Sequence, residues 1–174
     1  MESLKKTFFG LVIVTIVFLI WTASLPEKLD MTKTQTYSSS LDEMYAQLSD
    51  FDGWEAWFPW RDSSLDIQIS GEEGAGQKLL WEHPEQGSGH MEMTEVFEDS
   101  LLRFKIVLIE DTNPVLSDLK FIRKNTGRTE LQWHMYDNLT YEWPLGRLRA
   151  FVIQKMAGKN IERALDDLSS QLTH

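Results

Sequence analysis

The stretch Asp50–Trp81, DFDGWEAWFPWRDSSLDIQISGEEGAGQKLLW, decides how the chain is interpreted. It contains four of the seven tryptophans, at positions 54, 57, 60 and 81. It also contains GEEGAG at positions 71–76, where three glycines permit the positive φ angles of a tight turn. Because it combines aromatic surface with turn chemistry, the stretch predicts the entrance and one wall of a hydrophobic pocket.

The composition indicates one folded domain with an appendage. The chain has 174 residues, of which 42% are hydrophobic and 25% are charged, as in ordinary globular proteins. Its net charge is -10, and removing residues 1–25, with Lys5, Lys6 and Glu2, leaves -11. So acidic a body repels phosphate backbones, which argues against nucleic acid as a partner. The absence of cysteine excludes disulfides, thiolate catalysis and cysteine-ligated zinc.

The N-terminal segment predicts a membrane anchor through residues 7–25. Residues 8–23, FFGLVIVTIVFLIWTA, carry no charge, and the apolar span is close to the minimum for a hydrocarbon core about 30 Å thick. Lys5 and Lys6 precede this span, which favours a cytoplasmic N-terminus. Residues 1–25 are therefore expected to form a single-pass anchor. Residues 26–174 are expected to form a ligand-binding domain on the outer side, periplasmic or extracellular.

Two alternatives to an anchor remain open. A cleaved signal peptide also has a basic start and an apolar centre, and Thr22-Ala23-Ser24 offers small residues for cleavage. A buried helix of a soluble protein is the third interpretation, but so uniformly apolar a run has no polar face for water.

The remainder of the chain predicts an α+β domain. Its predicted elements are a strand Leu29–Tyr37, a helix Leu41–Ser49, a short helix or turn Asp50–Trp57, strands Asp66–Ser70, Gln77–Glu82, Gly89–Phe97, Leu101–Glu110, Val115–Arg123 and Thr129–Asp137, and a helix from Leu145 to about Leu172. Ser40 followed by Glu43 predicts a capping box at the first of these helices. Gly158 inside the last helix suggests close packing or a bend. Strands separated by turn signals indicate an antiparallel meander, with the long helix across a curved sheet.

Four segments match a known sequence pattern in order and spacing. They are Asp50-Phe51 with the three following tryptophans and Pro59, then Gly71, Gly74-Ala75-Gly76 and Trp81, then Gly89 through Glu95, and finally Met156, Gly158-Lys159 and Ile161-Glu162 to Leu168. Over residues 28–172 the chain thereby resembles the START-like (SRPBCC) superfamily, and within it the polyketide cyclase/dehydrase-type branch. Trp57-Phe58 departs from the usual Trp-Asn pair. The resemblance implies a helix-grip fold with a cavity between sheet and helix. It does not imply one function, because the superfamily includes lipid carriers, hormone receptors and cyclases.

Large apolar side chains are predicted to line that cavity. The nine candidate ligand-binding residues are Trp57, Trp60, Trp81, Met93, Phe104, Phe121, Trp133, Phe151 and Met156. Trp60 and Trp81 are expected to border the cavity, with the helix that carries Phe151 and Met156 on its other side. Ordinary core packing is the alternative for each of them. An apolar cavity with a few polar anchors suits an apolar small molecule or lipid, and tryptophan N–H groups can be such anchors.

Acid–base catalysis requires an ionisable side chain inside the cavity. The candidates are Glu95, Arg103, Asp118, His134 and Tyr136. Glu95 is the first of these, because it shares a strand face with Met91 and Met93 and could point inward. A surface position or an ion pair with Arg103 is the alternative. The four histidines lack the spacing of a metal site, and no cofactor motif is recognisable, so neither a metal nor a cofactor is predicted.

Three classes of function follow. The favoured one is a membrane-anchored START-like domain that binds an apolar small molecule or lipid without catalysis. The second is a polyketide cyclase/dehydratase-type enzyme that uses the same cavity. The third is a non-catalytic envelope protein-interaction module, which would have an exposed apolar patch beside Trp54–Trp60. The sequence indicates neither the ligand nor the oligomeric state.

Overall fold

The computed structural model divides the chain into two compact units. The structure describes residues 2–61, 63–84, 87–108, 113–124 and 127–172. Met1–Leu29 and Asn138–Lys155 form one unit, which we call the helical unit. Asp30–Asp137 and Met156–His174 form the other, which we call the sheet unit. Helix α3 (Leu145–Gln171) therefore contributes its first turns to the helical unit and its later turns to the sheet unit.

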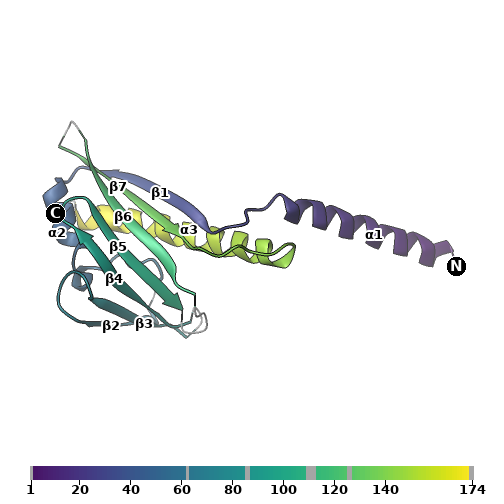
Figure 1. The fold of residues 1–174 in the computed structure, drawn as a ribbon, viewed down its shortest axis with the longest axis horizontal. Helices are drawn as coiled ribbons and strands as arrows, with labels where there is room; N and C mark the ends of the chain where they lie inside the picture. The colour runs from purple at the N-terminus through teal and green to yellow at the C-terminus, as the bar shows by residue number, and fades with distance from the viewer. Residues whose placement is uncertain (1, 62, 85–86, 109–112, 125–126, 173–174) are drawn as a thin grey trace. The chain divides into compact units, whose positions relative to one another are not determined.

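The sheet unit contains a seven-stranded antiparallel sheet (Figure 1). Its strands are β1 (Asp30–Tyr37), β2 (Asp66–Ser70), β3 (Lys78–Glu82), β4 (Gly89–Phe97), β5 (Leu101–Leu108), β6 (Val115–Arg123) and β7 (Thr129–Tyr136). The order is β1-β7-β6-β5-β4-β3-β2, so that β2 to β7 form a meander and β1 pairs with β7. The predicted α+β architecture with its antiparallel meander is confirmed. One predicted boundary, the strand end at Glu110, lies outside the described residues.

Helix α2 (Leu41–Leu48) begins where the capping motif predicts. The Ser40 hydroxyl accepts a hydrogen bond from the Glu43 backbone N–H at 3.2 Å, and the Glu43 carboxylate accepts one from the Ser40 N–H at 3.0 Å. This capping box satisfies two backbone donors at the helix start. A single 3-10 turn, η1 (Phe51–Gly53), follows and leads into the tryptophan-rich segment.

The GEEGAG segment forms the predicted turn between β2 and β3. Gly71, Gly74 and Gly76 have φ angles of 92°, 94° and 95°. Residues with a Cβ rarely adopt these angles, so the three glycines are a backbone requirement. No phosphate-binding role is needed to account for them.

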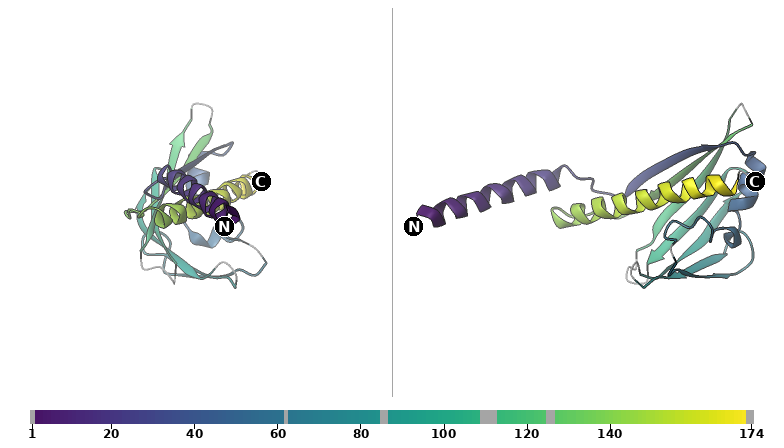
Figure 2. Two further views of the ribbon diagram at one scale, coloured as in Figure 1. Left: turned by 90° about the vertical axis from the view of Figure 1, so that its right-hand side faces the viewer. Right: turned by 180° about the vertical axis from the view of Figure 1, so that it is seen from behind.

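The later turns of α3 lie beside β1 (Figure 2). The Tyr37 hydroxyl on β1 donates to the Leu165 carbonyl at 2.9 Å, and Lys33 forms an ion pair with Glu162. A Cβ added at Gly158 would lie 3.4 Å from Lys33 Cε, an ordinary van der Waals distance, so β1 packs beside this glycine without requiring it. The buried face of these turns consists of Ala157, Ile161, Ala164, Leu165 and Leu168.

The helical unit joins α1 (Glu2–Ala23) to the chain around the start of α3. Arg147 donates to the Ala23 carbonyl at 2.8 Å and forms an ion pair with Glu27. The Tyr141 N–H donates to the Glu27 carbonyl at 2.8 Å. The last turn of α1 has no basic residue of its own, so Arg147 provides the cation that its terminal carbonyls favour.

Candidate functional site

Four buried rings form an inner aromatic cluster in the sheet unit: Trp54, Trp57, Phe104 and Trp133. The two tryptophans after η1 lie 4.3 Å apart between ring centroids. Phe104 on β5 and Trp133 on β7 lie 6.0 Å apart, and each contacts Trp54 edge-on. None of the four has measurable exposure, so this part of the interior is filled by direct ring contacts.

A second aromatic group surrounds Trp81. Trp60 stacks on Trp81 with centroids 5.4 Å apart and an interplanar angle of 7°, and Phe58 contacts both rings. The Trp81 ring also covers Gly89, its cross-strand partner on β4. A Cβ at Gly89 would lie 2.5 Å from Trp81 Cζ2 and 2.6 Å from the Val107 carbonyl oxygen. The glycine therefore provides the space in which Trp81 lies.

The three indole N–H groups of the inner aromatic cluster differ in their partners. Trp54 Nε1 donates to the Leu48 carbonyl at 3.1 Å, and Trp133 Nε1 donates to the Ser117 hydroxyl at 2.7 Å. Trp57 Nε1 is buried and has no hydrogen-bond partner within the described part of the chain. An unsatisfied buried donor costs about 1–3 kcal/mol. The interior therefore holds one unused N–H donor among apolar rings.

Gln77 holds the tryptophan-rich segment against the sheet, and the sequence analysis did not identify it. Its side chain is buried, accepts a hydrogen bond from the Phe51 N–H at 3.0 Å and donates to Asp50 at 2.6 Å. The sequence could have identified Gln77 by strand alternation, because Gln77 lies two and four residues before the inward-facing Leu79 and Trp81. A polar side chain at such a core position needs a hydrogen-bond partner.

The predicted acid–base residues come together, but on the outer face of the sheet. Glu95, Arg103, Asp118 and His134 are successive cross-strand partners on β4, β5, β6 and β7, and we call them the outer polar row. Arg103 makes two hydrogen bonds to Asp118, at 2.8 and 3.0 Å, and one to Glu95 at 2.8 Å. The Asp118 carboxylate raises the pKa of Arg103 above its usual range.

The expectation that Glu95 could point inward is wrong. The register of β4 against β5 shifts between Met93 and Glu95, which leaves Thr94 as an extra residue. Such a bulge reverses the alternation of side chains beyond it. Met93 faces the interior opposite Phe104, whereas Glu95 lies opposite Arg103, and its side chain is 48% exposed. This geometry gives Glu95 an ion-pairing position instead of one in a dry pocket.

The comparisons with known proteins concern structure only. No family model matches the chain, and no curated protein matches it. The di-domain ARO/CYC StfQ from the steffimycin biosynthetic pathway matches with a TM-score of 0.66 and 11% identity over 84% of this chain and 51% of StfQ. A Rhodobacter sphaeroides protein matches with a TM-score of 0.61 and 18% identity over 83% and 93%. The Aha1 dimer from Colwellia psychrerythraea matches with a TM-score of 0.56 and 14% identity over 82% and 95%.

The chain has a START-like helix-grip fold. At identities of 11–18% the likeness extends to the fold alone. The chain also spans only about half the length of StfQ. The site must therefore be argued from its own residues.

The START-like sheet brings most of the nine candidate ligand residues to its inner side. Met93 and Phe121 are buried there with Trp81 and the inner aromatic cluster, and Trp60 is half-buried at the border. Phe151 belongs to the helical unit, where its ring lies 6.2 Å from that of Trp21. The sequence placed Phe151 and Met156 together on one wall, and the structure assigns them to different units.

Met156 does not line the interior, contrary to expectation. Its side chain is 63% exposed. At 3.6 residues per turn it lies about 140° around the helix from Ile161, which belongs to the buried face. Apolar residues on both sides of α3 make the two faces hard to distinguish from the sequence alone.

His134 and two buried ionisable residues of the sheet unit have interaction partners of their own. His134 Nε2 lies 3.0 Å from Asp30, and its ring stacks on Tyr136 at 4.6 Å. His83 and Asp137 are buried, which the sequence did not predict, and both have interaction partners. Within the described ranges no three His, Asp or Glu side chains gather as a metal site, and His174 lies outside them. Trp54 and Trp57 are fully buried, so neither contributes to an exposed apolar patch.

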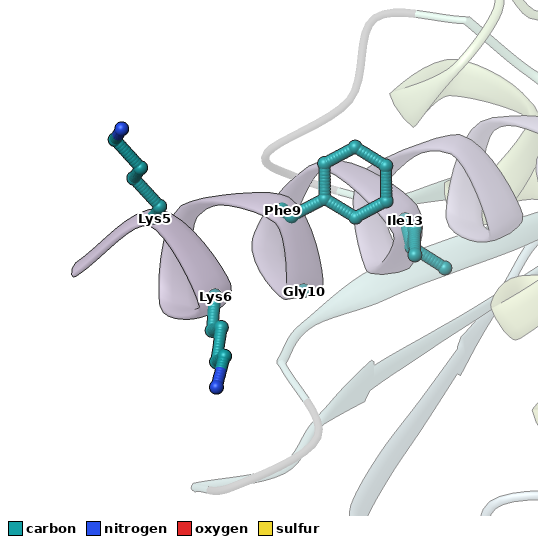
Figure 3. Close-up of a pocket in the computed structure, with 5 residues that line it drawn as sticks. All are labelled: Lys5, Lys6, Phe9, Gly10 and Ile13. Carbon is teal, nitrogen blue, oxygen red and sulfur yellow. The ribbon is translucent and has the colours of Figure 1, made fainter. Parts of the chain in front are cut away.

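A groove also runs along the first turns of α1 (Figure 3). It is lined by Lys5, Lys6, Phe9, Gly10 and Ile13. The lysine side chains extend away from the helix, while Phe9 and Ile13 present apolar surface further along. This arrangement separates charge from apolar surface along the helix, as at the edge of a bilayer.

Proposed function

We propose that the chain is a membrane-anchored START-like domain that binds an apolar small molecule or lipid between its sheet and the later turns of α3. The observation that carries the proposal is the unpartnered N–H of Trp57, buried within the inner aromatic cluster. A ligand oxygen at this position would provide the missing acceptor, and because the rings are in direct contact, at least one of them would have to move aside to admit it. The ligand is therefore an apolar molecule that bears a carbonyl, hydroxyl or carboxylate oxygen.

The inner face of the sheet suits ligands of variable shape. Met91, Met93 and Met135 are buried on β4 and β7 beside the aromatic rings. Methionine is unbranched and polarisable, so it adapts to irregular apolar surfaces. An apolar lining with a single directed donor is typical of sites that hold hydrophobic molecules in one orientation.

The proposed anchor is α1. Its 22 residues give a length of about 33 Å, and its apolar composition is sufficient to cross a membrane. Lys5 and Lys6 at its start favour a cytoplasmic N-terminus, which places the sheet unit on the outer side. Attachment to a membrane would keep the domain next to a reservoir of apolar ligands.

The proposal includes no reaction. Glu95 and Asp118 both pair with Arg103 on the outer face, where water reaches the three side chains. General acid–base catalysis needs such groups beside the bound substrate, with pKa values near the working pH. The outer polar row faces water and so does not lie beside a ligand on the inner face of the sheet.

The test is native mass spectrometry of the full chain after extraction into mild detergent. The wild-type protein is expected to carry a co-purified hydrophobe, which is then identified by its mass. Trp57→Phe keeps an aromatic ring but removes the donor, and should weaken retention of that molecule about tenfold. Trp143→Phe, in the helical unit, is the control and should retain it fully.

Two results would overturn the proposal. One is a wild-type protein that carries no hydrophobe under any extraction condition and whose thermal stability fails to rise when a fluorescent fatty acid is added. The other is equal retention in the wild type and the Trp57→Phe variant, which would show that the Trp57 N–H does not bind the ligand.

A further inference from the structure

The helical unit exposes apolar side chains outside α1. Trp143, Leu145 and Val152 are 48%, 68% and 45% exposed. Leu145 and Val152 are seven residues apart, so they lie on the same side of α3. Ala150, which is fully buried, lies on the opposite side. The first turns of α3 therefore have a solvent-facing side that carries large apolar groups.

The same segment is basic in an acidic protein. Residues 138–155 contain three cations, Arg147, Arg149 and Lys155, and one anion, Glu142, for a net charge of +2. Since the whole chain carries -10, the other residues carry -12. Arg147 pairs with Glu27, and Arg149 and Lys155 are exposed, with the Lys155 ammonium 5.5 Å from the centroid of the Phe151 ring. Exposed cations beside exposed apolar groups are typical of segments that lie on anionic bilayers.

Contacts within the helical unit hold this segment at the end of α1. Trp143 Nε1 donates to the Leu19 carbonyl at 3.3 Å, and Arg147 donates to the Ala23 carbonyl. The Phe151 ring lies edge-on to Trp21. The last turn of a spanning helix is where the chain leaves the hydrocarbon, so residues bonded to it lie at the depth of the headgroups.

We propose that Trp143, Leu145 and Val152, flanked by Arg149 and Lys155, form a second membrane contact that lies on the anionic surface of the bilayer in which α1 is anchored. We call these five residues the interfacial face. Tryptophan is favoured at this depth, and Trp21 and Trp143 both occur there. This inference rests on the proposed anchor but is independent of ligand binding.

The absence of cysteine allows a direct test with single-cysteine spin labels on the full chain in lipid nanodiscs. Leu145→Cys and Val152→Cys report on the interfacial face, and Ile13→Cys reports on the anchor. Phe97→Cys is the matched control, because Phe97 is an equally apolar side chain, 52% exposed, in the sheet unit. Collisions with oxygen, which concentrates in lipid, and with a water-soluble nickel complex identify the surroundings of each label.

The expected result is high oxygen and low nickel accessibility at 145, 152 and 13, and the reverse at 97. High nickel accessibility at 145 and 152, with the Ile13 label in lipid, would overturn the interfacial face and leave the anchor intact. Low accessibility to both reagents at 145 would overturn the bilayer contact, because it would show that a protein partner or a second copy of the chain covers this residue. A water-exposed Ile13 label would overturn the anchor and this inference with it.

The role of charge is tested in nanodiscs of phosphatidylcholine with or without phosphatidylglycerol. Arg149→Gln and Lys155→Gln should each shift the Leu145 label towards nickel accessibility about fivefold in the anionic discs, and leave it unchanged in the neutral ones. Arg163→Gln, an exposed cation on the later turns of α3, is the control and should change neither. An equal shift of the Leu145 label in the anionic and the neutral discs would overturn the recognition of anionic headgroups by Arg149 and Lys155.

Discussion

The two faces of the START-like sheet have opposite chemistry, although the same strands build both. The inner face carries tryptophan, phenylalanine and methionine, with the Trp57 N–H as an unsatisfied donor. The outer face carries cross-strand rows of charge in which each group has a partner, such as Glu95–Arg103–Asp118 and Lys78–Glu92–Lys105. Charge is thus paired where water is present, whereas within the described part of the sheet unit the unsatisfied buried side-chain donor is the Trp57 N–H in the interior. The proposed binding of an apolar molecule relies on this difference.

The largest expected effect of a substitution is at Gly89, on the inner face. Gly89→Ala would place a methyl group 2.5 Å from Trp81 and 2.6 Å from the backbone at Val107, so both must move. Overpacking of this kind costs about 3 kcal/mol, which urea unfolding would measure. The neighbouring outward-facing change His90→Ala should stay within about 0.5 kcal/mol. Similar losses for the two variants would show that Trp81 does not depend on the glycine.

Two variants of the inner aromatic cluster, compared with each other, test whether the Trp57 N–H is unsatisfied. Trp133→Phe and Trp57→Phe both shrink a buried ring, but only Trp133→Phe breaks a hydrogen bond and leaves Ser117 without its donor. Trp133→Phe should therefore be less stable than Trp57→Phe by about 1–3 kcal/mol in the ligand-free protein. If chemical denaturation gives equal stabilities, then Trp57 Nε1 has an acceptor in solution.

Tyr37 links the inner side of β1 to α3 and makes the stability depend on alkaline pH. Burial, with a further contribution from Asp166, raises the pKa of the Tyr37 hydroxyl. The folded state therefore keeps this proton when the unfolded chain loses it, so wild-type stability falls as pH rises above 10.0. Tyr37→Phe should lose about 1 kcal/mol at neutral pH and show a smaller alkaline decline. Parallel stability profiles for variant and wild type would contradict the assignment.

The smallest effect is expected on the outer face. Glu95→Gln removes one half-exposed partner of Arg103, and such pairs contribute about 0–1 kcal/mol. Ligand retention measured by mass spectrometry should not change. A loss of retention would contradict the separation of roles between the two faces, because it would show that ligand binding in the interior depends on the outer polar row.

Much of the fold could be predicted because it depends on local chemistry. The capping box at Ser40, the positive φ angles of the GEEGAG glycines and the period-two strands each depend on a few adjacent residues. The aromatic content of the inner face followed from the same alternation. These features require no knowledge of distant contacts.

The errors concern features that a single position or a distant partner decides. Thr94 adds one residue to β4 and so reverses the side on which Glu95 lies, which no alternation pattern predicts. Met156 is apolar, but the choice between the two faces of α3 depends on what packs against them. The assignment of Phe151 to the helical unit follows from contacts with α1, more than a hundred residues earlier in the chain.

The bond between Tyr37 and Leu165 has a consequence for the order of synthesis. It joins residues 128 positions apart, and the later turns of α3 are made only after every strand of the sheet. Until they arrive, nothing from α3 covers the inner face of the completed sheet. Long-range closure of this kind slows folding. A sheet that is made before the helix that packs on it exposes apolar surface during synthesis, and such surface promotes aggregation.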